Sequence, residues 1–152
     1  MSAILAFIFT VLSGVMIYVM GQIILKLMIE PVHEAKKTIA EISHSLVEYA
    51  DIIHNPGVLA QEKTIEVSQH LRRLSAQLHA HLFLIPCYRK TAWVFGLPSR
   101  DKILTAATQL RGLSNVIFST RENIHEEIAK RCEAICDALG IYFAADERWP
   151  KE

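Results

Sequence analysis

Residues 3–25 read AILAFIFTVLSGVMIYVMGQIIL, and this stretch decides the organisation of the chain because none of its side chains is charged. As an α-helix it is about 34 Å long, which is enough to cross the roughly 30 Å hydrocarbon core of a bilayer. We predict a single N-terminal transmembrane helix, with residues 1–30 forming the helix and its exit from the membrane.

A cleavable signal peptide is the main alternative for such a segment. It needs a basic residue ahead of the apolar run and small residues at its end. Here the first basic residue is Lys26, and the run ends in the large residues IIL at 23–25. Since only Lys26, Lys36 and Lys37 flank the span, all on its C-terminal side, the positive-inside rule predicts an outer N-terminus and a cytoplasmic C-terminal domain. We expect the inner or cytoplasmic cell membrane.

The rest of the chain has the composition of an ordinary soluble domain. Its 152 residues hold 16 basic and 16 acidic side chains, a balance that argues against a protein that coats nucleic acid. The net charge is −3 over residues 31–70, +6 over 71–111 and −3 over 112–152. Three cysteines form a poor disulfide framework, which fits a reducing compartment. We expect a domain over 31–145 and a flexible tail over 146–152.

A heptad pattern of apolar residues follows the membrane exit. It consists of Val32, Ala35, Ile39, Ile42, Leu46, Tyr49 and Ile53, spaced alternately by three and four as in coiled-coil packing. The flanking positions hold small residues, Thr38, Ser43, Ser45 and Ala50, where a two-stranded coiled coil carries charges. The pattern therefore favours a multi-helix bundle.

Three further helices are predicted. The first covers about residues 59–85, the second begins after Ser99 as its N-cap, and the third ends before Gly140 as its C-cap. Residues 87–97 are expected to be a broken segment, and Pro31 is expected to kink the junction with the membrane helix. No alternating strand pattern occurs. The predicted fold is all-α: one transmembrane helix that continues into a cytosolic bundle of about four helices joined as antiparallel hairpins.

A hairpin of two long helices returns the chain to the membrane surface. The returning segment, residues 83–102, combines aromatic and basic side chains, which headgroup regions favour. The candidate membrane-interface residues are Phe83, Tyr88, Arg89, Lys90, Trp93, Phe95, Arg100 and Lys102. Two other interpretations stay open: the aromatic residues cap the bundle core while Arg72, Arg73 and Arg111 pair with glutamates, or the segment binds a partner protein.

The membrane span itself has a candidate association face. Thr10 and Gly14 form a pair of small residues four apart, and Gly21 lies on the same side one heptad later. Close helix approach at these residues predicts self-association in the bilayer.

No motif for catalysis, metal or cofactor binding is evident. Cys132 and Cys136 are expected to be buried, the single histidines His33, His44, His54, His70 and His125 to be solvated, and His79 and His81 to point apart. We expect no cofactor, nucleic acid or small-molecule substrate. An enzyme would require a polar cavity inside the bundle, lined by residues such as Glu41, His44, Glu48, His70 and Arg73.

The sequence thus favours a membrane-tethered, non-enzymatic interaction, scaffold or regulatory module, whose partners are the lipid bilayer and a protein or a second copy of this chain. The alternative is a small membrane-active protein that perturbs lipid with residues 83–102, as a toxin would.

Overall fold

A computed structural model describes residues 2–55, 61–119 and 123–142. Within these ranges the regular structure is helical and no strand occurs, so the all-α prediction is confirmed. The predicted tail over 146–152 and most of the expected helix restart near Ser119 lie outside the described residues.

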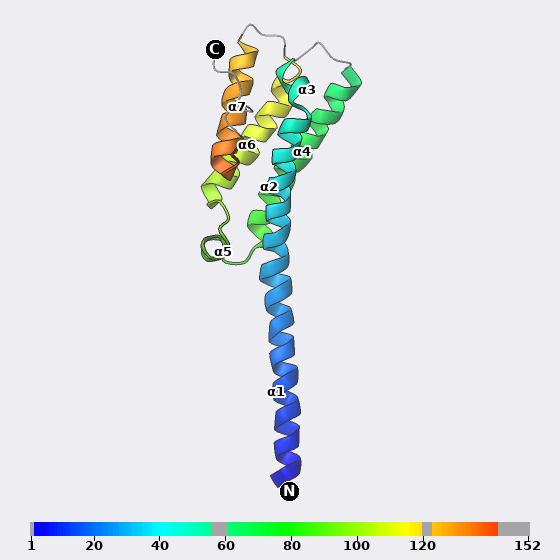
Figure 1. The fold of residues 1–152 in the computed structure, drawn as a ribbon, viewed down its shortest axis with the longest axis vertical. Coiled ribbons are helices and arrows are strands. Elements are labelled where there is room, and N and C mark those ends of the chain that lie inside the picture. The colour runs from blue at the N-terminus through cyan, green and yellow to red at the C-terminus, as the bar shows by residue number, and fades with distance from the viewer. Residues whose placement is uncertain (1, 56–60, 120–122, 143–152) are drawn as a thin grey trace.

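The longest feature is a continuous N-terminal helix (Figure 1). It comprises α1 (Ser2–Ile24), the π-helical turn η1 (Leu25–Ile29) and α2 (Glu30–Glu48). We call α1 and η1 together the stem. Nearly all described side chains of the stem are exposed, and they are predominantly large and apolar. Within the described residues, this is the one helix long and apolar enough to cross a membrane by length and composition.

The junction at Pro31, where a kink is predicted, contains a local widening of the helix. Pro31 has no N–H to donate to the helical ladder, and its ring crowds the carbonyl one turn earlier. In the turn just before it, the Glu30 N–H bonds the Leu25 carbonyl, a π-type spacing. The stem therefore passes into α2 without a flexible linker (Figure 1).

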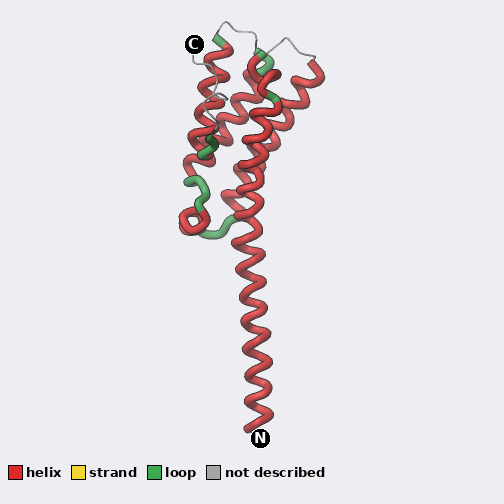
Figure 2. Tube along the Cα trace, viewed as in Figure 1, coloured by secondary structure: helices red, strands yellow, loops and turns green. Residues whose placement is uncertain are grey.

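The bundle is built from α2 and three further long helices, α4 (Gln61–Leu84), α6 (Arg100–Val116) and α7 (Ile124–Leu139). Consecutive members pack side by side and run antiparallel (Figure 2). The short α3 (Ala50–His54) prolongs α2 beyond a turn at Tyr49 and contacts α7. The expected four-helix arrangement is confirmed.

The predicted heptad pattern forms the inner face of α2 and α3. Val32, Ala35, Ile42, Leu46 and Ile53 are buried, and Ile39 and Tyr49 are partly buried against the core. The main core also includes Leu71, Leu74, Leu78, Leu110, Leu113, Ile128 and Ile135. Both caps are as predicted: the Ser99 hydroxyl accepts from the Lys102 N–H, and Gly140 is left-handed, with φ 69°.

Small hydroxyl residues join the helices through the interior. Thr38 Oγ1 lies 2.9 Å from His81 Nε2, and Ser45 Oγ lies 2.9 Å from His70 Nε2. Both hydroxyls donate their single hydrogen to a carbonyl one turn earlier in α2, so each oxygen accepts from the histidine N–H. Burial of both hydroxyl residues confirms the wide contact face inferred from the small flanking residues.

Two sequence expectations are wrong. His54 and His70 are half-buried rather than solvated, because both helices turn them toward neighbouring elements. Residues 87–97 are not merely broken, since they contain a further helix, α5 (Tyr88–Phe95). As predicted, His79 and His81 diverge: His79 is exposed with its ring edge-on to Phe83, and His81 faces α2.

We predict that stability falls as the pH drops through about 6.5, the ordinary pKa of histidine. Burial lowers the pKa of His81, opposed by Glu34, and His81 Nδ1 is a buried atom without a hydrogen-bond partner in the described structure. The unfolded chain therefore binds a proton more readily, and stability is lost as pH falls until the folded-state pKa is passed. Burial lowers the pKa of His54 in the same direction.

The measurement is the urea midpoint in detergent micelles, followed by circular dichroism at several pH values. His81→Gln should reduce the dependence of the urea midpoint on pH. The dependence that remains should be the contribution of His54. The exposed His33→Gln is the matched control and should keep the parent slope. An unchanged slope in His81→Gln would contradict the assignment.

Candidate functional site

The segment 83–102, which we call the foot of the bundle, packs beside the start of α2. A second apolar cluster joins Val32 and Ala35 of α2 to Ile85, Ala92 and Leu97 of the foot. The returning hairpin inferred from helix lengths is therefore present, and it brings the foot to the end of the bundle where the stem begins (Figure 1).

Helix α5 is fixed firmly within the foot. It starts after Cys87, which is left-handed with φ 49°, and ends at Gly96, with φ 66°. The Leu97 N–H bonds the Ala92 carbonyl, which is the six-to-one bond of a Schellman cap, and the Gly96 N–H bonds the same carbonyl. The Thr91 hydroxyl donates to the Pro86 carbonyl over 2.9 Å. These contacts define the direction of a helix of only eight residues.

The two faces of α5 differ sharply. Its inner face consists of Tyr88, Thr91, Ala92 and Phe95, which are spaced as residues on one side of a helix are. Thr91 and Ala92 are buried, and Tyr88 and Phe95 are partly buried. The Tyr88 hydroxyl donates to the Pro98 carbonyl over 2.8 Å, and burial raises its pKa. Its outer face lines a shallow open groove and consists of Arg89, Lys90, Trp93 and Val94.

The structure thus divides the eight predicted interface residues. Tyr88 and Phe95 cap the second apolar cluster, as the core-capping interpretation expected. The exposed members are Phe83, Arg89, Lys90, Trp93, Arg100 and Lys102. Trp93 is 86% exposed and Phe83 is 72% exposed, so the core does not explain them. Leu84 and Val94, which the sequence prediction did not include, are also exposed and large.

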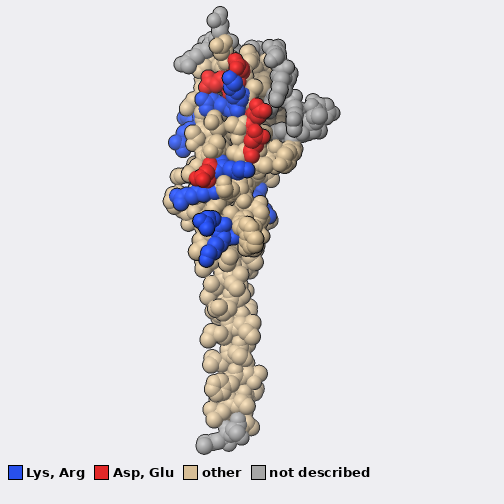
Figure 3. Space-filling view, turned by 90° about the vertical axis from the view of Figure 1, so that its left-hand side faces the viewer, with Lys and Arg blue, Asp and Glu red and all other residues tan. Residues whose placement is uncertain are grey.

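The foot has a defined orientation relative to the stem. In Figures 1 and 2, α5 is seen end-on while α1 runs vertically, so the two helix axes are roughly perpendicular. The space-filling view of this side shows Lys and Arg gathered at the lower end of the bundle, directly above the uncharged part of the stem (Figure 3). A plane drawn across α1 at this level therefore passes through α5.

The predicted association face of the stem is open. A Cβ added at Gly14 or Gly21 would meet nothing within 4 Å. The Thr10 hydroxyl donates to the Ala6 carbonyl over 2.9 Å, so its donor is satisfied within the helix. Small residues rather than an unpaired donor therefore characterise this face.

The residues considered for chemistry do not line a cavity inside the bundle. Glu41, His44, Glu48 and Arg73, expected around an enzyme cavity, are exposed on the bundle surface. Among the described residues no three His, Cys, Asp or Glu side chains are placed to share a metal ion. Cys132 and Cys136 are buried as predicted, and burial raises their pKa values to about 12 and about 11, which keeps both thiols protonated.

No protein-family model, curated protein or solved structure matches this chain. Its function is therefore inferred from its own geometry.

We predict that Trp93 and Tyr88 contribute very differently to stability. Trp93→Ala should change the free energy of unfolding by less than about 0.5 kcal/mol, as is usual at an exposed position. Tyr88→Phe should cost about 1 kcal/mol, because it removes the hydrogen bond to the Pro98 carbonyl. Urea unfolding followed by circular dichroism compares the two variants. Equal destabilisation would mean that Trp93 belongs to the core.

Proposed function

We propose that the protein is a single-pass, membrane-anchored, non-enzymatic adaptor. In this proposal α1 crosses the inner or cytoplasmic membrane, the outer face of α5 rests on the lipid headgroups, and the rest of the bundle is held for a partner at the cytoplasmic face. The observation that carries the proposal is the exposed aromatic and cationic face of α5, next to the apolar stem.

Helix lengths support this position of α5 relative to the bilayer. The stem keeps exposed apolar side chains up to Ile29, whereas Val32 is buried in the bundle. The seven steps from Leu25 to Val32 span about 10 Å along the helix, and the headgroup region on one side of a bilayer is roughly 5–8 Å thick. The foot lies at the level of Val32, so a membrane-spanning α1 brings α5 to the outer edge of this region.

The side-chain chemistry of the foot fits that layer. Trp93 combines an apolar ring with an N–H donor, the combination enriched at membrane interfaces. Arg89 and Lys90 add positive charge, and each basic residue near an anionic leaflet contributes about 1 kcal/mol to binding. The lysines after the span favour the same cytoplasmic side.

A membrane-active role of the foot, the alternative interpretation, is less well supported. Inserting α5 into the bilayer would require its inner face to leave the second apolar cluster and break the bonds of Tyr88 and Thr91. A helix fixed in this way is suited to docking on a surface. Growth arrest and membrane depolarisation on over-expression, abolished by Trp93→Ala, would instead favour the alternative.

The docking of the foot can be measured by fluorescence quenching. Trp149→Phe leaves Trp93 as the only tryptophan. In nanodiscs of lipids brominated near the top of the acyl chain, we expect Trp93 emission to fall by about half relative to unbrominated lipids, because the ring sits at the interface.

The matched control moves the tryptophan to the opposite end of the bundle. The variant Trp93→Phe, Phe118→Trp, Trp149→Phe places it just beyond the end of α6, at a position that is half exposed. Its emission should be insensitive to bromine. Equal emission of Trp93 with and without bromine would refute docking of the foot.

Self-association through the stem gives a separate prediction. Replacing Gly14 and Gly21 by Ile should lower dimerisation in bilayers by about tenfold, because the larger side chains keep two helices apart. The open surroundings of both glycines mean that the folded monomer tolerates the change. Energy transfer between labelled chains in liposomes measures it, and Val15→Ile is the matched control. Unchanged transfer in the double variant would exclude this face.

A further inference from the structure

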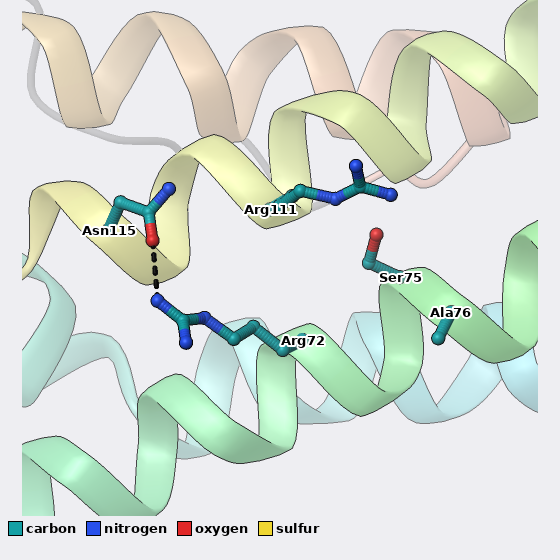
Figure 4. Close-up of a pocket in the computed structure, with 5 residues that line it drawn as sticks. All are labelled: Arg72, Ser75, Ala76, Arg111 and Asn115. Carbon is teal, nitrogen blue, oxygen red and sulfur yellow. Dashed lines mark hydrogen bonds between the residues drawn. The ribbon is translucent and has the colours of Figure 1, made fainter.

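A second exposed cleft lies between α4 and α6, away from the foot (Figure 4). It has a volume of about 410 Å³ and is lined by Arg72, Ser75, Ala76, Arg111 and Asn115. Sequence reasoning considered its two arginines only as partners of glutamates and did not predict a cleft, because they are far apart in the chain. Antiparallel packing of α4 on α6 brings them to one opening.

One arginine of the cleft is held in place by its neighbours. Arg72 Nη2 donates to Asn115 Oδ1 over 2.6 Å, and Arg72 Nε donates to Ser114 Oγ over 3.3 Å. A guanidinium carries five N–H donors in a rigid planar fork. Arg72 therefore keeps donors available while its orientation is set.

The other arginine has no such partner. The Arg111 carbonyl accepts from the Ser114 hydroxyl, but its guanidinium makes no hydrogen bond or ion pair with the part of the chain that the structure describes. The Ser75 hydroxyl donates its hydrogen to the Ala107 carbonyl over 2.7 Å. The two guanidinium groups are thus the strong donors that this cleft offers.

The positive charge of the cleft is not neutralised locally. The ion pairs among the described residues join Lys37 to Glu34, His44 to Glu48, Lys130 to Glu126 and Arg131 to Glu127. Neither cleft arginine is among them, so the pairing with glutamates that the core-capping interpretation expected is not found there. Residues 71–111 carry a net charge of +6, which favours an anionic ligand.

With α1 in the membrane as proposed, the cleft lies too far above the foot to bind lipid of the same membrane. Arg72 precedes Leu84 by twelve residues along α4, and Arg111 follows Arg100 by eleven along α6. At about 1.5 Å per residue, the cleft lies some 16–18 Å from the foot. That distance exceeds the Debye length of about 8 Å at physiological ionic strength. The anion must come from the soluble side.

The directions of the side chains indicate the kind of anion. Figure 4 shows Arg72 reaching toward Asn115 and Arg111 extending over Ser75, so the two guanidinium groups do not converge on one point. A lone phosphate would be bound best by converging forks, whereas separate carboxylates along a peptide match two separated forks.

We propose that this cleft binds an acidic segment of a partner protein, with one carboxylate on Arg72 and another on Arg111. The proposal rests on the adaptor role, whose partner it describes by its chemistry. The outcome of the fluorescence experiment at Trp93 concerns the foot alone, so failure of the one is distinguishable from failure of the other.

The test uses the full chain in nanodiscs of zwitterionic lipid. The probe is a short fluorescein-labelled helical peptide with glutamate at every fourth position, and its glutamine counterpart is the negative control. We expect the glutamate peptide to bind and the double variant Arg72→Gln, Arg111→Gln to weaken binding by about tenfold or more, because both carboxylates lose charged donors.

Arg73→Gln is the matched control, since Arg73 is the exposed neighbour of Arg72 and does not line the cleft. Its affinity for the peptide should stay within about twofold of the parent. An equal loss in Arg73→Gln would reveal only a general charge attraction and overturn the proposal. Circular dichroism confirms that each variant is folded.

Two competitors separate the remaining outcomes. Inorganic phosphate, or vesicles containing phosphatidylserine, should displace the peptide no better than chloride does at the same ionic strength. Specific displacement by phosphate would identify a phosphate site instead, and displacement by the vesicles would identify a lipid site. Either result, or absence of glutamate-peptide binding at millimolar concentration, overturns the proposal.

Discussion

The antiparallel packing of α2 against α4 is the contact on which the rest of the structure depends. Since α2 continues the stem without a break, whatever packs on α2 is fixed relative to the stem. The buried residues Ile42 and Leu46 of α2 share the core with Leu71, Leu74 and Leu78 of α4. This packing directs α4 back toward the stem and determines where the foot lies.

Interior hydroxyls set the register of these helix pairs. Along α4, Ser68 and Ser75 donate to the carbonyls of Ser114 and Ala107, so a step of seven residues along α4 matches a step of seven back along α6. Apolar surfaces tolerate sliding, whereas a displaced hydroxyl would leave a buried polar group unsatisfied. The same register that fills the core also brings Arg72 and Arg111 to one cleft.

Much of this fold follows from local sequence, and the unpredicted parts follow from tertiary contacts. The uncharged run predicted the stem, and the heptad spacing predicted the inner face of α2. Ser99 and Gly140 predicted two helix ends. Helix α5 was missed because its start depends on a left-handed Cys87 and on bonds to the carbonyls of Pro86 and Pro98. The signal was available in the spacing of Tyr88, Thr91, Ala92 and Phe95, read at helical period.

The continuity of stem and bundle fixes the position of the bundle relative to the stem. A flexible linker would let the bundle sample many heights above a membrane, but here the irregularity is confined to one π-helical turn. Under the proposed placement, the foot and the cationic cleft lie at two fixed levels separated by more than a Debye length. Their charges would therefore act almost independently, and a soluble anion at the cleft would not compete with anionic lipid beneath the foot. In the proposed role, a partner bound at the cleft would be held at a set distance from the bilayer, as an adaptor requires.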